Sequence, residues 1–168
     1  MKHFIFIVAI FFVGTESSIA QPHNSLWQCP VVDVTAKLAA DTLTFGREIL
    51  VTITLTNKSQ TTKSVWFDKP QLNTGGPAAT SVKLTNRKTG ESVLKYENKA
   101  ILISQAYTND QIKSNAYLLK PGDNISGEFS LYSLVVLPGN KKYLDKGDYE
   151  MQVFYCKNKS DKLCFSVN

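Results

Sequence analysis

The sequence contains very little histidine, and this scarcity excludes several classes of enzyme. Histidine occurs only at His3 and His23, both close to the amino terminus. His3 lies in a segment that we expect to be removed, so no second histidine remains to complete a catalytic triad or an HExxH zinc site. The G-x-S-x-G elbow, the P-loop and the dinucleotide glycine fingerprint are also missing. The sequence therefore predicts that the chain is not an enzyme.

Arginine is equally scarce, which argues against nucleic-acid binding. The net charge is +5, yet among the 19 basic residues the only arginines are Arg47 and Arg87. Bidentate recognition of phosphates and bases favours the guanidinium fork, whereas a lysine-dominated surface is more typical of solubility. We expect no nucleic-acid partner and at most a weak preference for acidic partners.

Residues 1–20 predict a cleaved secretory signal peptide. Lys2 precedes a short apolar run from Phe4 to Val13, and Ser18-Ile19-Ala20 places small residues before a cut at Gln21. The run is shorter than the roughly 20 apolar residues that cross a bilayer. We therefore expect no membrane span and an exported protein, either periplasmic or extracellular.

The three cysteines agree with an oxidising compartment. Cys156 and Cys164 flank the polar segment "KNKSDKL", and the strands expected on both sides would place the two sulfurs on one outer face of a terminal hairpin. We predict a disulfide between Cys156 and Cys164, with Cys29 free or bonded to another molecule. Pairing of Cys29 with either of the others stays open at this point.

The dominant period in the rest of the chain is two, which is typical of β-strands. In "EILVTITLTN", Val51, Ile53 and Leu55 alternate with threonines. Further strand-like segments occupy 32–39, 43–45, the surroundings of Trp66, a hairpin with arms at Val82 and Val93, 101–104, 116–119, 125–131, 149–155 and 162–167. No segment carries a helical period over about twelve residues. The pattern predicts an all-β protein, a single antiparallel immunoglobulin-like β-sandwich of about 7–9 strands at 31–168, after an extension at 21–30.

The order of turns and strands resembles that of a known module. It runs through "VTITLTNKS", "TNRKTGESVLKYE", "LLKPGDNISGEFSLYSL" and "KGDYEMQVFY", over most of the chain after residue 20. It is similar to the immunoglobulin-like module that precedes the catalytic domain in deuterolysin-type metallopeptidases, and to secreted proteinase-inhibitor sandwiches. The metallopeptidase helix with its paired histidines is absent here. The resemblance implies the sandwich without the enzyme.

An uncharged run from Leu134 to Gly139, "LVVLPG", stands between two expected strands. Just after it, Leu144, Gly147 and Tyr149 match a tyrosine corner, in which the tyrosine hydroxyl binds the preceding connection. A connection that crosses the open end of a sandwich needs apolar cover, so the run is interpreted first as a lid over the core. The second interpretation is an exposed loop for a partner.

For that second interpretation the candidate partner-binding residues are Leu134, Val135, Val136 and Leu137, with Trp66 and Tyr107 as aromatic anchors. Trp66 lies within an apolar strand, which also makes it a candidate for the core.

Crowded carboxylates are the remaining chemical feature. Asp145, Asp148 and Glu150 lie within one turn and strand start, which is typical of solvated turn polarity and more weakly of a calcium site. Sequons at Asn57 and Asn124, and a further one at Asn158, would be glycan sites in a eukaryotic secretory pathway. We expect no metal, no cofactor and no catalytic residue.

These features together predict an exported, monomeric, non-catalytic binding protein. Its function would be to inhibit or neutralise a hydrolase, as a protease inhibitor or an immunity-type protein, through a loop that enters a cleft or through strand addition. The alternative is a structural or adhesive module of the envelope or the extracellular space. Such a module would self-associate or bind a surface, whereas an inhibitor would form a one-to-one complex.

Overall fold

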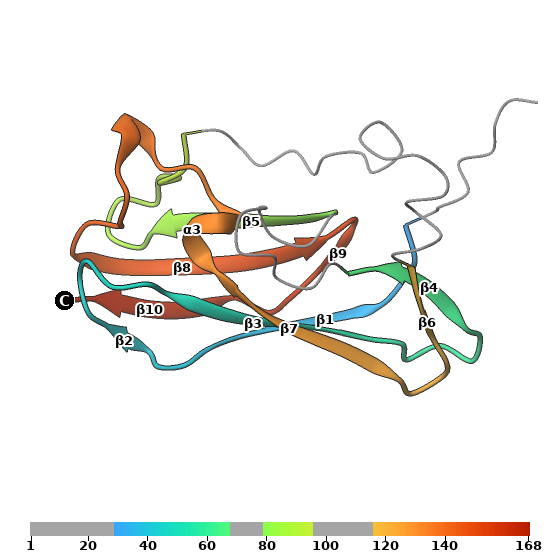
Figure 1. Ribbon diagram of the computed structural model, residues 1–168. Helices are drawn as coiled ribbons and strands as arrows, with labels where there is room; N and C mark the ends of the chain where they lie inside the picture. Colours follow the sequence, from blue (N-terminus) through green and yellow to red (C-terminus); the bar gives the residue numbers. More distant parts are fainter. Residues whose placement is uncertain (1–28, 68–78, 96–115) are drawn as a thin grey trace, which may run out of the picture.

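The computed structural model describes residues 29–67, 79–95 and 116–168, and almost all regular structure in these ranges is strand (Figure 1). The strands are β1 (Asp33–Leu38), β2 (Thr42–Leu43), β3 (Leu50–Thr56), β4 (Lys63–Trp66), β5 (Thr80–Asn86), β6 (Ala116–Leu119), β7 (Asn124–Ser130), β8 (Gly147–Tyr155), β9 (Asn158–Lys159) and β10 (Leu163–Val167). A single helical turn, α3 (Leu131–Leu134), and a 3-10 turn, η1 (Pro138–Asn140), lie between β7 and β8. The all-β prediction is confirmed.

The strands form three sheets. The first has the order β1-β3-β7, and the second has the order β2-β10-β8-β5 with β9 added beside β8. β4 and β6 pair only with each other among the described strands. The pairing is antiparallel throughout except between β10 and β2, where Ser166 and Val167 run parallel to Thr42 and Leu43. The two larger sheets therefore each combine strands that are distant in the sequence.

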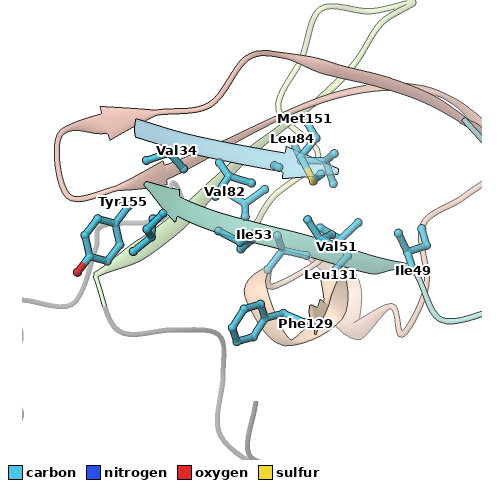
Figure 2. Close-up of a cluster of buried hydrophobic side chains, with 14 of the residues drawn as sticks. Val34, Ile49, Val51, Ile53, Val82, Leu84, Phe129, Leu131, Met151 and Tyr155 are labelled. Atoms are coloured by element: carbon cyan, nitrogen blue, oxygen red, sulfur yellow. The ribbon is translucent and has the colours of Figure 1, made fainter. Parts of the chain in front are cut away.

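Strand alternation places the apolar faces of the two larger sheets in one core (Figure 2). Val51 and Ile53 of β3 are buried in the same cluster as Leu84 of β5 and Met151 of β8. Fully burying a side chain of this size contributes about 1.5–3 kcal/mol. The opposite face of β3 carries threonines besides the exposed Leu50, and Thr54 there shares a 2.8 Å hydrogen bond with Ser126 of β7. The period-two pattern thus predicted both faces of β3 correctly.

Tyr155 and Trp66 join β8 to the β4–β6 sheet. The Tyr155 hydroxyl accepts a hydrogen bond from the Trp66 backbone N–H at 2.9 Å and donates one to the Trp66 carbonyl at 3.0 Å. Both side chains are buried. The ring of Phe67, the next residue, meets Phe129 of β7 edge to face, with the centroids 5.6 Å apart. These contacts tie the small sheet to both larger ones.

Asn57 is a buried polar residue at the end of β3. Its amide Nδ2 donates to the carbonyls of Thr61 and Leu119, at 2.9 and 2.8 Å. Its Oδ1 accepts the backbone N–H and the hydroxyl of Ser59. The side chain thus satisfies both its donor and its acceptor capacity while holding the following turn against β6.

The disulfide prediction was wrong. Cys29 is bonded to Cys156, with 5.9 Å between the Cα atoms, and Cys164 is a free, exposed cysteine. Cys164 does face outward as expected, but the strand register places it opposite Glu150. That position lies about 20 Å along β8 from Cys156 at about 3.3 Å per residue, far beyond the roughly 7 Å that a disulfide spans. Cys29 is therefore neither free nor intermolecular.

Several element boundaries also differ from the prediction. The second arm of the expected hairpin near Val93 makes one isolated bridge, from Ser92 to Thr85, and no strand. The two-residue strand β9 and the turn α3 were not predicted. The expected segment 101–104 lies outside the described residues, as do residues 1–28 with the predicted signal peptide.

Candidate functional site

The candidate site is the connection between β7 and β8, residues 131–146, together with the turn after β5 that packs against it. α3 opens the connection, and its first residue, Leu131, is buried in the core. The backbone then extends, with φ −134° and ψ 152° at Val135 and φ −81° and ψ 148° at Leu137. In this extended segment the side chains alternate: Val135 and Leu137 are each 7% exposed, whereas Val136 between them is 53% exposed.

Hydrogen bonds fix this connection at three points. The Leu131 N–H donates to the Ile49 carbonyl at 2.7 Å, and the Lys95 N–H donates to the Val136 carbonyl at 2.9 Å. The Tyr149 hydroxyl donates to the Asp145 carbonyl at 2.8 Å, which confirms the predicted tyrosine corner. The extended segment is thus held on both sides of Val136.

These observations divide the predicted partner-binding run. Val135 and Leu137 belong to the core cluster, and Leu134 packs against it half-buried, which confirms the core-lid interpretation for these positions. Val135 and Leu137 therefore do not form part of an exposed contact surface. Val136 is the member of the run that the fold presents to solvent.

The predicted aromatic anchors do not join this site. Trp66 is 1% exposed, and it bonds to Tyr155 at the far end of β8 from the tyrosine corner. Its interpretation as a core residue is confirmed, and it is not available as a surface anchor. Tyr107 lies outside the described residues, so its role stays a prediction.

A pocket of about 320 Å³ opens beside the connection. Its apolar lining comes from Val93, Leu137, Pro138, Leu144 and the ring of Tyr149, and its polar lining from Asn86, Lys141, Tyr143, Asp145 and Lys146. It forms where the turn after β5 meets the end of the 131–146 connection. Sequence reasoning missed this pocket because its two walls are far apart in the chain, although "PGNKKYLDKGD" does mark the basic wall.

Some of the polar groups around the pocket have partners in the described protein, and others do not. Lys141 is ion-paired with Asp145, and the Lys142 ammonium lies 5.2 Å from the centroid of the Tyr143 ring. Lys146 is exposed and makes no ion pair or side-chain hydrogen bond within the described ranges. Burial raises the pKa of the Tyr149 hydroxyl, and the neighbouring Asp145 carboxylate raises it further. The tyrosine corner therefore stays neutral and keeps its proton for the Asp145 carbonyl.

The three crowded carboxylates have separate partners. Asp145 pairs with Lys141, Glu150 pairs with Lys162 at 2.8 Å, and Asp148 accepts a hydrogen bond from the Ser166 hydroxyl. Within residues 29–67, 79–95 and 116–168, no group of three or more histidine, cysteine or acidic side chains is placed to hold a metal ion. The described helices include none that is long and apolar enough to cross a membrane.

Comparisons with known proteins give no family for this chain. No family model matches it, and no curated protein matches it. One solved structure that it matches is the Pseudomonas fluorescens alkylpurine DNA glycosylase AlkC bound to DNA containing an abasic site analog, at 11% identity and a TM-score of 0.46. The match covers 83% of this chain but only 31% of the glycosylase chain. A likeness this weak carries no argument about function.

Proposed function

We propose that this chain is an exported, non-catalytic binding protein with an immunoglobulin-like β-sandwich, and that it neutralises a hydrolase through the loop around Val136. The observation that carries the proposal is the exposure of Val136 between the two buried side chains of Val135 and Leu137. The burial on both sides anchors the loop, so little conformational entropy is lost when a partner binds.

The backbone geometry supports a contact with an enzyme cleft. A partner that binds a segment by strand addition takes it in an extended conformation, and Val135 and Leu137 both have extended backbone angles. The Val136 carbonyl is already held by the Lys95 N–H, so the loop would enter a cleft in a fixed shape. An aliphatic side chain at its tip suits an apolar subsite. The Cys29–Cys156 disulfide supports an oxidising, exported location.

A second function, assembly into a structural or adhesive module, is favoured by a different residue. Leu118 is 71% exposed and belongs to β6, which pairs with β4 and is not part of the 131–146 connection. Large exposed aliphatic side chains mark contact sites when they gather in a patch. In this second function the protein would self-associate through Leu118, and it would not bind an enzyme through Val136.

The test compares two matched variants, Val136→Asp and Leu118→Asp, in capture from the producing organism's secreted and envelope fractions. If the hydrolase proposal is right, the protein should capture an enzyme and lower its activity when the two are equimolar. The Val136→Asp variant should no longer capture this enzyme, whereas Leu118→Asp should still capture it. The assembly function expects an oligomer in sedimentation velocity that Leu118→Asp dissolves. Capture of a hydrolase that Val136→Asp leaves unchanged would contradict the proposed loop.

A further inference from the structure

The pocket beside the tyrosine corner has the composition of a ligand site, and nothing in the proposed hydrolase contact uses it. Its volume of about 320 Å³ lies at the lower end of the range for small-molecule sites, about 300–1,000 Å³. Leu137 and Leu144 in its lining are buried core residues, and Tyr149 is fixed by its hydrogen bond to Asp145. The apolar wall is therefore preformed.

The rim of the pocket carries hydrogen-bond donors that have no acceptor in the described protein. The Asn86 Oδ1 accepts the N–H groups of Lys88 and Thr89, at 2.9 and 3.2 Å, which fixes the orientation of its amide. Its Nδ2 then lies toward the start of β8, since a Cβ atom on Gly147 would be 3.8 Å from it. No hydrogen bond from Nδ2 joins it to the described residues.

The charge of the rim is positive by one unit. Lys141 and Asp145 form an ion pair and neutralise each other. The ammonium of Lys146 remains without a counter-charge among the residues that the structure describes. A carboxylate placed here would accept from Lys146 and from the Asn86 amide, and charge-assisted hydrogen bonds of this kind are about twice as strong as neutral ones.

We propose that this pocket binds an apolar group that carries a single carboxylate, with the apolar part against Leu137, Leu144 and Val93 and the carboxylate between Lys146 and Asn86. A cationic ligand would leave Lys146 opposed by a like charge. A dianion would exceed the one uncompensated positive charge of the rim. Two sources share the proposed chemistry: a free small acid, and the carboxyl terminus of a peptide that ends in an apolar residue.

The test is an NMR titration of the purified protein with N-acetyl-L-phenylalanine and, as the neutral control of equal shape, N-acetyl-L-phenylalaninamide. We expect saturable amide shifts at Asn86, Val93, Leu144 and Lys146 with the acid. The amide should bind at least about fivefold more weakly, because it lacks the negative charge that the Lys146 ammonium attracts.

Two lysine variants with equal loss of net charge sharpen the test. Lys146→Gln should weaken binding of the acid by about fivefold or more and abolish its advantage over the amide. Lys157→Gln, on the exposed turn after β8, should change the dissociation constant by less than about twofold. If both variants bound the acid equally weakly, the effect would come from the net charge of the protein, and the proposed site would be wrong.

The source of the ligand is distinguished by two further probes, 3-phenylpropionate and the tripeptide N-acetyl-Gly-Gly-Phe with a free carboxyl terminus. Stronger binding of the tripeptide would assign the pocket to a peptide terminus, and stronger binding of 3-phenylpropionate would assign it to a free acid. Shifts that map outside the pocket, or none that saturate by about 20 mM, would overturn the proposal. Val136→Asp should leave this titration unchanged, so the pocket and the hydrolase loop can fail independently.

Discussion

Among single residues, Asn57 illustrates how misleading a surface motif can be. It begins an N-x-S triplet, which is typical of an exposed glycan site. In the fold its side chain is 0% exposed, and its Nδ2 is occupied by the carbonyls of Thr61 and Leu119. Asn124, in another triplet, is exposed at the start of β7. A glycan on the folded protein would be compatible with Asn124 and not with Asn57.

Replacing Asn57 by alanine should lower the free energy of unfolding by about 2–4 kcal/mol, because it leaves buried backbone groups without partners. Urea unfolding followed by tryptophan fluorescence measures the loss. The matched variant Asn124→Ala should change stability by less than about 0.5 kcal/mol. Similar values for the two variants would show that the Asn57 hydrogen bonds contribute little.

Tyr149 links stability to alkaline pH. Burial raises its pKa in the folded state, so the unfolded chain, whose tyrosines ionise near pH 10, loses the proton first. The stabilisation is therefore complete below about pH 10 and is lost as pH rises through the folded pKa. Tyr149→Phe should cost about 0.5–1.5 kcal/mol at neutral pH and reduce the alkaline decline.

The measurement for Tyr149 is urea unfolding from pH 7 to 11, with Tyr117→Phe as the control. The Tyr117 hydroxyl has no hydrogen bond to other described residues, so this control should be nearly neutral at pH 7. An alkaline decline in Tyr149→Phe that parallels the unmodified protein would rule out Tyr149 as its source.

The sequence predicted Tyr149 and missed Asn57 for a physical reason. The tyrosine corner closes over four residues, so its spacing is visible in the chain. Asn57 contacts Leu119, 62 residues away, and no local pattern records such a pair. Burial of Trp66 was predictable from its apolar strand, whereas its hydrogen bonds to Tyr155 were not.

Among the elements, the connection between β7 and β8 joins core packing to the proposed partner contact. Its alternation of buried, exposed and buried side chains follows from an extended backbone, which turns successive side chains to opposite sides. The six-letter run "LVVLPG" contains no polar residue to mark which side chain points outward. Composition therefore could not separate Val136 from its neighbours.

Aspartate substitutions at the neighbouring positions 135 and 136 should lower the stability of the fold by very different amounts. Val135→Asp buries an unpaired carboxylate and should destabilise the fold by about 3 kcal/mol or more, whereas Val136→Asp should cost less than about 1 kcal/mol. Thermal unfolding followed by circular dichroism compares them. If both variants unfold at the same temperature, the alternation of burial along this loop is refuted.

Short elements account for most of the differences between the predicted and observed strands. β3 and β8 were predicted because their alternation extends over 7 and 9 residues. β9 has 2 residues and α3 has 4, too few to establish a period. Their conformations depend on tertiary contacts, such as the burial of Leu131 of α3 in the core.

At the scale of the whole molecule, the Cys29–Cys156 bond closes a loop with a sequence separation of 127 residues. A crosslink over so long a loop restricts the unfolded chain strongly, and loss of the bond should cost about 3–5 kcal/mol. The Cys29→Ser, Cys156→Ser double variant should show this loss in urea unfolding. Cys164→Ser should be neutral, because that cysteine is free and exposed.

If Cys164→Ser destabilised the protein as much as the double variant, the assignment of the disulfide would be wrong. The sequence left this pairing open because cysteine spacing does not give connectivity. The preference for Cys156–Cys164 considered the face of each strand but not the distance along it, which only the register of β8 and β10 supplies.

The same bond determines how the protein would respond to a mechanical pull on its two ends. Force entering at the amino terminus reaches Cys29 and passes directly to Cys156, so it bypasses the chain between them. Only β9 and β10 lie beyond that point, and β10 would peel from β8 and β2. The backbone from β1 to β8 lies inside the loop closed by the disulfide, so the pull is not transmitted along it. A pull on both ends would therefore extend the protein by a short length and keep the rest of its core intact.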